Sequence, residues 1–160
     1  MLIQTATIHD LGAIAQVEAL CFPPAEAADQ SSIQRRLTVF PDRFWLLWEG
    51  DTLVCFVNGM LTDLPDLSDE MYENASLHNS DGSWQMIFGV DTIPAFRRQG
   101  CAEQVLTHVI EQCKRENRRG LVLTCKEHLL HYYAKFGFQN EGFSQSVHGN
   151  VQWYQMRLTF

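Results

Sequence analysis

Two adjacent arginines and a glycine lie directly before the strongest helical pattern of the chain. They belong to the segment Arg97-Arg98-Gln99-Gly100-Cys101-Ala102, which follows an apolar run typical of a buried strand. A glycine-containing turn into a helix leaves backbone N–H groups pointing outward, where the helix dipole adds partial positive charge. Arginines beside the turn add full charge, so the segment suits a phosphate group. The alternative is that Gly100 only permits a tight turn and both arginines are solvated.

Motifs for other phosphate and metal chemistry are absent. The chain has neither a G-x-x-x-x-G-K-S/T loop nor a G-x-G-x-x-G turn, so phosphoryl and hydride transfer are not indicated. The five cysteines contain no C-x-x-C pair, and H-E-x-x-H is missing. We therefore expect reduced thiols and no bound metal.

The spacing around the turn is similar to that of a known family. Arg97, Gly100 and Ala102 fit the R/Q-x-x-G-x-G/A signature of the GNAT superfamily of N-acetyltransferases, and residues 133–138 match its Y-x-x-x-G-F segment. A narrower resemblance is to the arylalkylamine (serotonin-type) N-acetyltransferases, whose L-x-C-x-x-x-L-x-x-F/Y-Y stretch is matched by residues 123–133. The resemblance covers most of the chain from Trp45 onward.

This resemblance implies that acetyl-CoA is the acetyl donor and that an amine accepts the group directly in a ternary complex. In the superfamily the pantetheine arm pairs with backbone groups of one strand, which correspond here to Val90, Asp91 and Thr92. The pyrophosphate site then comprises Arg97, Arg98, Gln99, Gly100, Cys101, Ala102 and Glu103.

Two catalytic roles follow from the same resemblance. Tyr133 matches the tyrosine that protonates the departing thiolate, although it could instead be a packing residue. The strand positions at which vertebrate arylalkylamine enzymes carry histidines are Met86 and Phe88 here, so a histidine relay is not expected. Glu26 lies in a loop that resembles the acceptor-side loop of the branch and is the candidate base, with a solvated loop acid as the alternative. His78 is a secondary candidate.

The acceptor site is expected to combine aromatic walls with an acidic rim. Residues 62–77 contain several acids and no lysine or arginine, and we expect Phe22, Glu70, Tyr72 and Phe88 to contact the acceptor. This favours a small aryl or alkyl amine, while a solvated acidic loop is the plainer alternative. A protein N-terminus or lysine acceptor, and a noncatalytic acyl-CoA-binding regulatory module, are the other hypotheses.

Composition and charge limit the number of domains and the classes of partner that the chain can have. The 160 residues are 46% hydrophobic and carry a net charge of -7, which predicts one globular domain over residues 1–160 and argues against nucleic-acid binding. No apolar stretch approaches the ~20 residues that cross a bilayer, and the N-terminus lacks a signal-like pattern. We expect a cytoplasmic protein that acts on a small-molecule amine, as a monomer or a homodimer.

Apolar periodicity predicts a mixed α/β fold of GNAT type, with a central mixed sheet of about six or seven strands flanked by about four helices. The strands are expected at residues 2–8, 44–48, 53–60, 84–90, 121–124, 138–143 and 153–158. The helices are expected after Asp10, after Ser31 or Ser32, from Ala102 to Cys113, and at residues 127–134.

Overall fold

The computed structural model describes residues 1–160. It contains nine strands in two sheets and five α-helices. The chain divides into two compact units, each built from two segments. Unit 1 comprises Met1–Gly59 and Gly89–Val109, and unit 2 comprises Met60–Phe88 and Ile110–Phe160.

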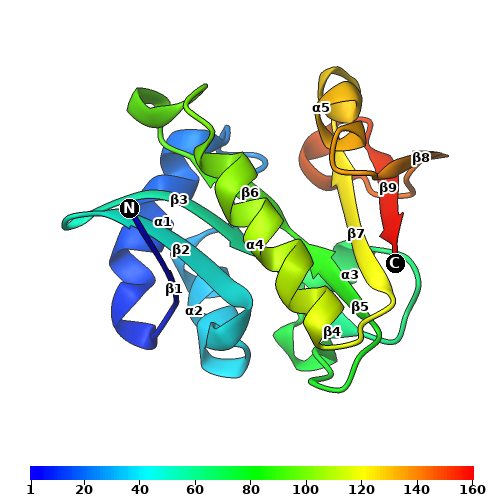
Figure 1. Cartoon of the computed structure of the whole chain (residues 1–160), viewed down its shortest axis with the longest axis horizontal. Coiled ribbons are helices and arrows are strands. Elements are labelled where there is room, and N and C mark those ends of the chain that lie inside the picture. The colour runs from blue at the N-terminus through cyan, green and yellow to red at the C-terminus, as the bar shows by residue number, and fades with distance from the viewer. The chain divides into compact units, whose positions relative to one another are not determined.

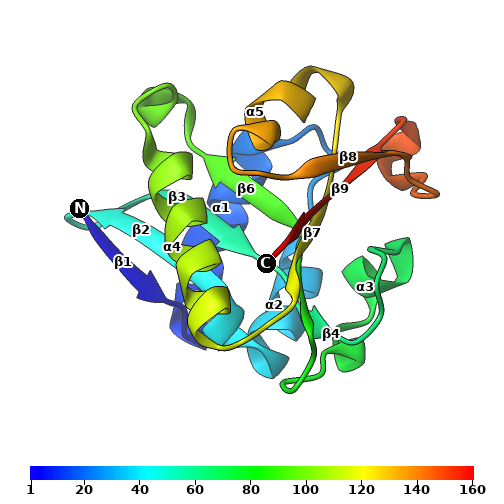
Figure 2. The same cartoon turned by 45° about the vertical axis from the view of Figure 1, so that its right-hand side comes forward.

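Unit 1 contains an antiparallel sheet with the strand order β1-β2-β3-β6 (Figure 2). Its strands are β1 (Leu2–Thr5), β2 (Phe44–Glu49), β3 (Thr52–Asn58) and β6 (Gly89–Thr92). The apolar strands β2 and β3 are the central pair and are almost entirely buried, as their continuous hydrophobic runs predict. β6 is an edge strand, paired only with β3.

Helices cover both faces of this sheet. α1 (Leu11–Cys21) and α2 (Gln30–Val39) pack together, and α1 contacts β3 and β6. In Figure 1 the first half of α4 (Cys101–Arg115) crosses the opposite face. α2 begins two or three residues earlier than predicted, because Asp29 rather than a serine is the N-cap and its Oδ1 accepts the Ser32 amide at 2.8 Å.

Unit 2 contains a mixed sheet with the strand order β4-β5-β7-β9-β8. Its strands are β4 (Leu61–Thr62), β5 (Trp84–Ile87), β7 (Gly120–Cys125), β8 (Gln139–Phe143) and β9 (Tyr154–Thr159). Only the β5–β7 pair is parallel, which is the arrangement expected of strands joined through a crossover.

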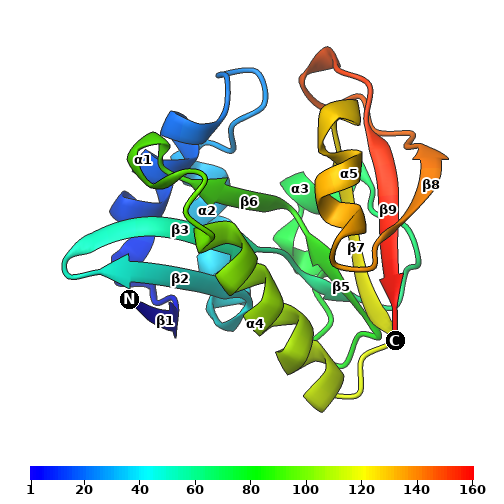
Figure 3. The same ribbon diagram turned by 45° about the horizontal axis from the view of Figure 1, so that its top comes forward.

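The remaining helices are short. α3 (Asp69–Glu73) lies in the acidic segment, and α5 (Leu130–Ala134) contacts β8 and β9, as Figure 3 shows. The predicted helix at residues 127–134 is a 3₁₀ turn that leads into α5. None of the helices combines the length and apolar composition that crossing a bilayer requires.

The predicted strand at residues 84–90 is wrong in one respect. The apolar run forms two strands, since β5 ends at Ile87 and β6 begins at Gly89, and they belong to different sheets. Hydrophobicity continues through Phe88, so it gives no signal for this break. The mixed α/β class is confirmed, with nine strands in two sheets in place of one sheet of six or seven.

Candidate active site

The turn before α4 has a backbone that only certain residues adopt readily. Arg98 has a φ of 62° and Gly100 a φ of 80°, both in the left-handed region. Such alternating turns direct successive N–H groups to one side and form a concave anion site. The first four amides of α4 also have no partner within the helix. A Cβ at Gly100 would meet no atom within 4 Å, so open space lies beside this glycine.

The side chains of the turn are mostly exposed. Arg97, Arg98, Gln99 and Glu103 are exposed, whereas Cys101 is buried. Arg97 donates from Nε to the carbonyl of Thr92 at 3.1 Å, which fixes its position beside the turn. The backbone is therefore the main source of directed donors, and the arginines add positive charge around them.

The outer edge of β6 offers backbone groups to a ligand. Ile93 donates its amide to Val54 at 3.0 Å, and alternation along an antiparallel pair then directs Asp91 toward β3 as well. The N–H and C=O groups of Val90 and Thr92 point to the outer edge. The Thr92 carbonyl is already used by Arg97, so Val90 is the freer of the two positions.

The loop between α1 and α2 carries Glu26, which is buried (8% exposed) rather than solvated. A turn begins at Pro23, whose carbonyl accepts the amides of Glu26 and Ala27, both at 2.9 Å. Phe22, from the same loop, is half-buried. Two proposed acceptor-side residues of unit 1 therefore lie on one short loop held by its own hydrogen bonds.

Tyr133 lies on α5 in unit 2 and is 8% exposed. Its ring packs edge-on against Tyr132, with 5.1 Å between centroids, and against Phe138 at 6.1 Å. Gly137 ends this segment with a φ of 99°, and a Cβ there would come within 3.1 Å of Leu158, so the glycine of the Y-x-x-x-G-F segment has a clear conformational reason.

An aromatic cluster in unit 2 gathers around Tyr72. The Tyr72 ring lies 4.9 Å from Phe88 and stacks on His148 at 5.2 Å, and His148 lies 6.2 Å from Trp153. Tyr72 also bonds through its hydroxyl to Thr124 at 3.2 Å. The structure brings together the predicted residues Tyr72 and Phe88. Sequence reasoning missed His148 and Trp153, because no spacing links this distant loop to α3.

The acidic rim is smaller than the sequence indicated, because several of its acids have structural partners. Asp66 pairs with Arg157 at 2.9 Å, and Asp69 accepts hydrogen bonds from Ser146 and Val147. The latter contacts hold the loop that carries His148. Glu70 is exposed on α3.

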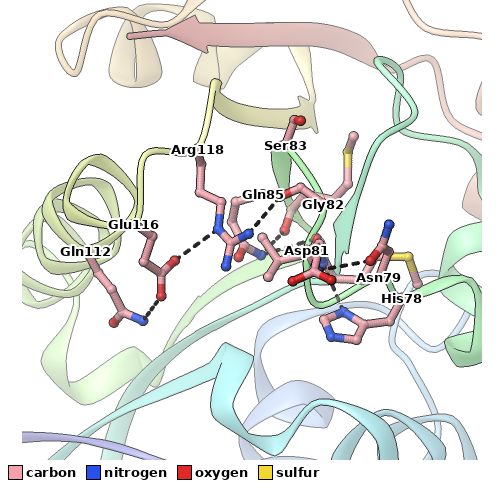
Figure 4. Close-up of polar contacts among 12 residues, drawn as sticks. His78, Asn79, Asp81, Gly82, Ser83, Gln85, Gln112, Glu116 and Arg118 are labelled. Atoms are coloured by element: carbon pink, nitrogen blue, oxygen red, sulfur yellow. Dashed lines mark hydrogen bonds and ion pairs between the residues drawn. The ribbon is translucent and has the colours of Figure 1, made fainter.

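His78 has a structural role. Its Nδ1 accepts the amide of Leu61 at 3.1 Å, so that nitrogen is not available as a proton acceptor. Figure 4 also shows a second network, centred on Arg118. Arg118 donates from Nε to Glu116 at 3.2 Å and from Nη1 to the carbonyl of Gly82 at 2.9 Å. These contacts hold the segment between β4 and β5.

Cys125, at the end of β7, is a poor nucleophile. It is buried, and burial raises its pKa to about 11, so the thiol stays protonated at neutral pH. No group of three or more His, Cys, Asp or Glu side chains is arranged to hold a metal ion.

Comparison with protein families identifies the family to which the chain belongs. The model of the acetyltransferase (GNAT) family matches residues 11–138. The chain belongs to the GNAT family. The protein is accordingly an N-acetyltransferase, and the matched range includes the turn before α4. None of the curated proteins matched the sequence.

Solved structures show the GNAT fold across the whole chain. The GNAT-like decarboxylase GphF in complex with isobutyryl-CoA has a TM-score of 0.84 at 18% identity, covering 99% of each chain. The ribosomal-protein-S18-alanine N-acetyltransferase of Escherichia coli has a TM-score of 0.74 at 16% identity, covering 99% of this chain and 92% of that one. A GNAT family acetyltransferase of Brucella melitensis in complex with acetyl-CoA has a TM-score of 0.63 at 17% identity, with 99% and 87% covered.

These likenesses confirm the expected GNAT-type fold. They span several activities, and binding of an acyl-CoA is a feature of two of the three proteins. The arylalkylamine branch has no support among them.

Proposed function

We propose that this GNAT enzyme transfers the acetyl group of acetyl-CoA directly to the primary amine of a small arylalkylamine. The observation that carries the acceptor class is the aromatic cluster of Tyr72, Phe88, His148 and Trp153. The rings of Phe88 and His148 lie 4.9 and 5.2 Å from the Tyr72 ring, measured between centroids. Such a surface suits an aromatic acceptor, because offset and edge-on ring pairs contribute binding free energy beyond that of apolar burial.

The donor side of the proposal uses unit 1. The open turn before α4 would hold the pyrophosphate through its backbone amides, and the outer edge of β6 would pair with the pantetheine arm. Acetyl-CoA supplies an activated thioester. The protein holds the thioester in place, removes a proton from the attacking amine and donates a proton to the departing thiolate.

Tyr133 is the proposed acid and Glu26 the proposed base. The attacking amine must be neutral, and a buried carboxylate can take its proton directly or through water. The departing thiolate takes a proton from a phenol, whose ordinary pKa near 10 is within reach of a thiol's. Both groups are buried in their own units, which strengthens their interactions with charge.

The test measures CoA release with a thiol reagent, using arylalkylamines, polyamines and short peptides as acceptors. Tyr72→Leu removes the stacking ring while keeping apolar volume, and should raise the KM for an arylalkylamine about tenfold. Tyr154→Leu is the matched control, because Tyr154 packs on Phe143 and contacts neither the cluster nor Tyr133. Turnover of peptides alone would replace this acceptor class by a protein N-terminus or lysine.

A further inference from the structure

Asp91 is a buried acid whose side chain the proposed mechanism does not use. It is 0% exposed, and neither of its carboxylate oxygens accepts a hydrogen bond from an N–H or O–H donor. Burying an ionised carboxylate without donors is costly, so such a group is rare in folded proteins. Its position on β6, next to Val90, places this anomaly on the strand proposed to hold the pantetheine arm.

The side chain that faces Asp91 from α1 belongs to another acid. Glu18, which is 7% exposed, lies one helical turn before Cys21, whose Sγ bonds to the carbonyl of Thr92 next to Asp91, and the negative charge of Glu18 raises the pKa of Asp91. Two ionised carboxylates can only accept hydrogen bonds and repel each other. A hydrogen bond between them therefore requires that one of them carry a proton.

The surroundings place that proton on Asp91. Burial, the negative charge of Glu18 and the nearby thiols of Cys21 and Cys55 raise the pKa of Asp91 well above its ordinary value. Two arginines in this unit are directed at other acceptors, since Arg36 donates to Asn58 and Arg97 to the Thr92 carbonyl. The raised pKa favours Asp91 as the protonated member of the pair.

Glu18 extends the contact to the acceptor-side loop. Its Oε2 accepts the amide of Ala28 at 2.9 Å, across ten positions of the chain. At the same junction Cys21 donates from Sγ to the Thr92 carbonyl at 3.3 Å. The carboxyl pair is therefore the middle of a connection that runs from β6 through α1 to the loop that carries Glu26.

A glycine makes room for this arrangement. A Cβ built at Gly89 would lie 2.8 Å from Oδ1 of Asp91, which is closer than real Cβ contacts allow. Residues 89 and 91 share one face of β6, so the carboxyl occupies the space that a side chain at position 89 would fill.

We propose that Asp91 and Glu18 share one proton, with Asp91 donating to Glu18, and that this pair positions residues 22–29 relative to β6. Asp91 and Glu18 are positioning residues in this scheme. Neither needs to touch a substrate, and the inference holds whichever acceptor the enzyme uses.

The first test follows stability against pH. The folded state keeps a proton that the unfolded chain releases above its ordinary pKa near 3.9, so the wild type loses stability as pH rises toward the folded pKa. Asp91→Asn still donates to Glu18 but cannot lose a proton. The unfolding constant of this variant relative to wild type should fall about tenfold per pH unit within that window. Asp51→Asn, in the exposed β2–β3 turn, corrects for the loss of one negative charge.

Carbon-13 NMR of the side-chain carboxyls tests protonation in the intact wild type, where folding is not in question. The Asp91 signal should remain at its protonated position at pH 7. Two results would contradict the shared proton. One is an Asp91 carboxyl signal at its ionised position at pH 7, and the other is a pH dependence of stability that is the same in Asp91→Asn and Asp51→Asn.

Hydrogen exchange tests the positioning role without any activity measurement. Glu18→Ala removes the acceptor of the Ala28 amide and should speed exchange there and across residues 22–29 by at least about tenfold, in proportion to the lost protection. Asp91→Ala should also speed it, whereas Asp91→Asn should preserve protection. Equal protection in Asp91→Ala and wild type would show that the pair does not position the loop.

Discussion

Comparing Gly100→Ala with Gly50→Ala separates the effect on phosphate binding from the effect of backbone strain. Both glycines lie in unit 1 and have a left-handed backbone, but only Gly100 belongs to the turn proposed to bind phosphate. Gly100 has a φ of +80° and Gly50, in the β2–β3 turn, a φ of +58°, and a Cβ at either would meet no atom within 4 Å. An alanine held in the left-handed region costs about 1–2 kcal/mol. Both variants should therefore lose a similar amount of stability, measured by urea unfolding.

Affinity for acetyl-CoA should distinguish the two variants. A methyl group at position 100 enters open space beside the turn that is proposed to hold the pyrophosphate. Losing close contact with one charge-assisted donor should weaken binding by about 1.4 kcal/mol, or about tenfold in Kd by calorimetry. Gly50→Ala should bind acetyl-CoA as the wild type does.

Two results would refute this reasoning. If Gly100→Ala binds acetyl-CoA as tightly as the wild type does, the turn does not hold the phosphates. If both variants weaken binding equally, the effect comes from general strain in unit 1. Repeating the titration with CoA fragments that lack the pyrophosphate locates any loss in that group.

Three further outcomes are expected. Tyr133→Phe keeps the ring contact with Phe138, so stability and the KM for acetyl-CoA should hold while kcat falls about a hundredfold; an unchanged kcat would remove the hydroxyl from catalysis. Since burial raises the pKa of Cys125 to about 11, mass spectrometry should find it unmodified by iodoacetamide at pH 7.5 until the protein unfolds, and native-state labelling would contradict this. Gly89→Ala should destabilise the fold by about 1–3 kcal/mol through its clash with the Asp91 carboxyl, and Asp91→Ala should lower that cost in a double-mutant cycle.

Local signals were enough to predict most of the elements. The apolar positions of α4, including Val105, Leu106 and Val109, recur at helical spacing and are all buried. Pro23 and Pro24 follow the end of α1, as prolines that cannot continue a helix should. Such features depend on neighbours in the sequence, so periodicity and turn chemistry reveal them.

The contacts of the candidate site are less accessible to sequence reasoning. His148 stacks on Tyr72 because Asp69 holds its loop through hydrogen bonds from Ser146 and Val147. The sequence pattern of that loop does not predict this long-range contact. The acid pair of Glu18 and Asp91 was equally hidden. An acid in a short strand and an acid in a helix both suggest exposed positions, and only tertiary packing buries them together.

The break at Phe88 connects the fold to the proposed acceptor site. The chain leaves one sheet at Ile87 and enters the other at Gly89, so the backbone of Phe88 belongs to neither ladder. A residue outside the ladders is not bound to the strict alternation of side chains along a strand. Its ring contacts Tyr72 at 4.9 Å and takes part in the aromatic cluster. The break therefore places an aromatic side chain in the cluster and leaves the next residues, from Gly89 on, free to pair with β3.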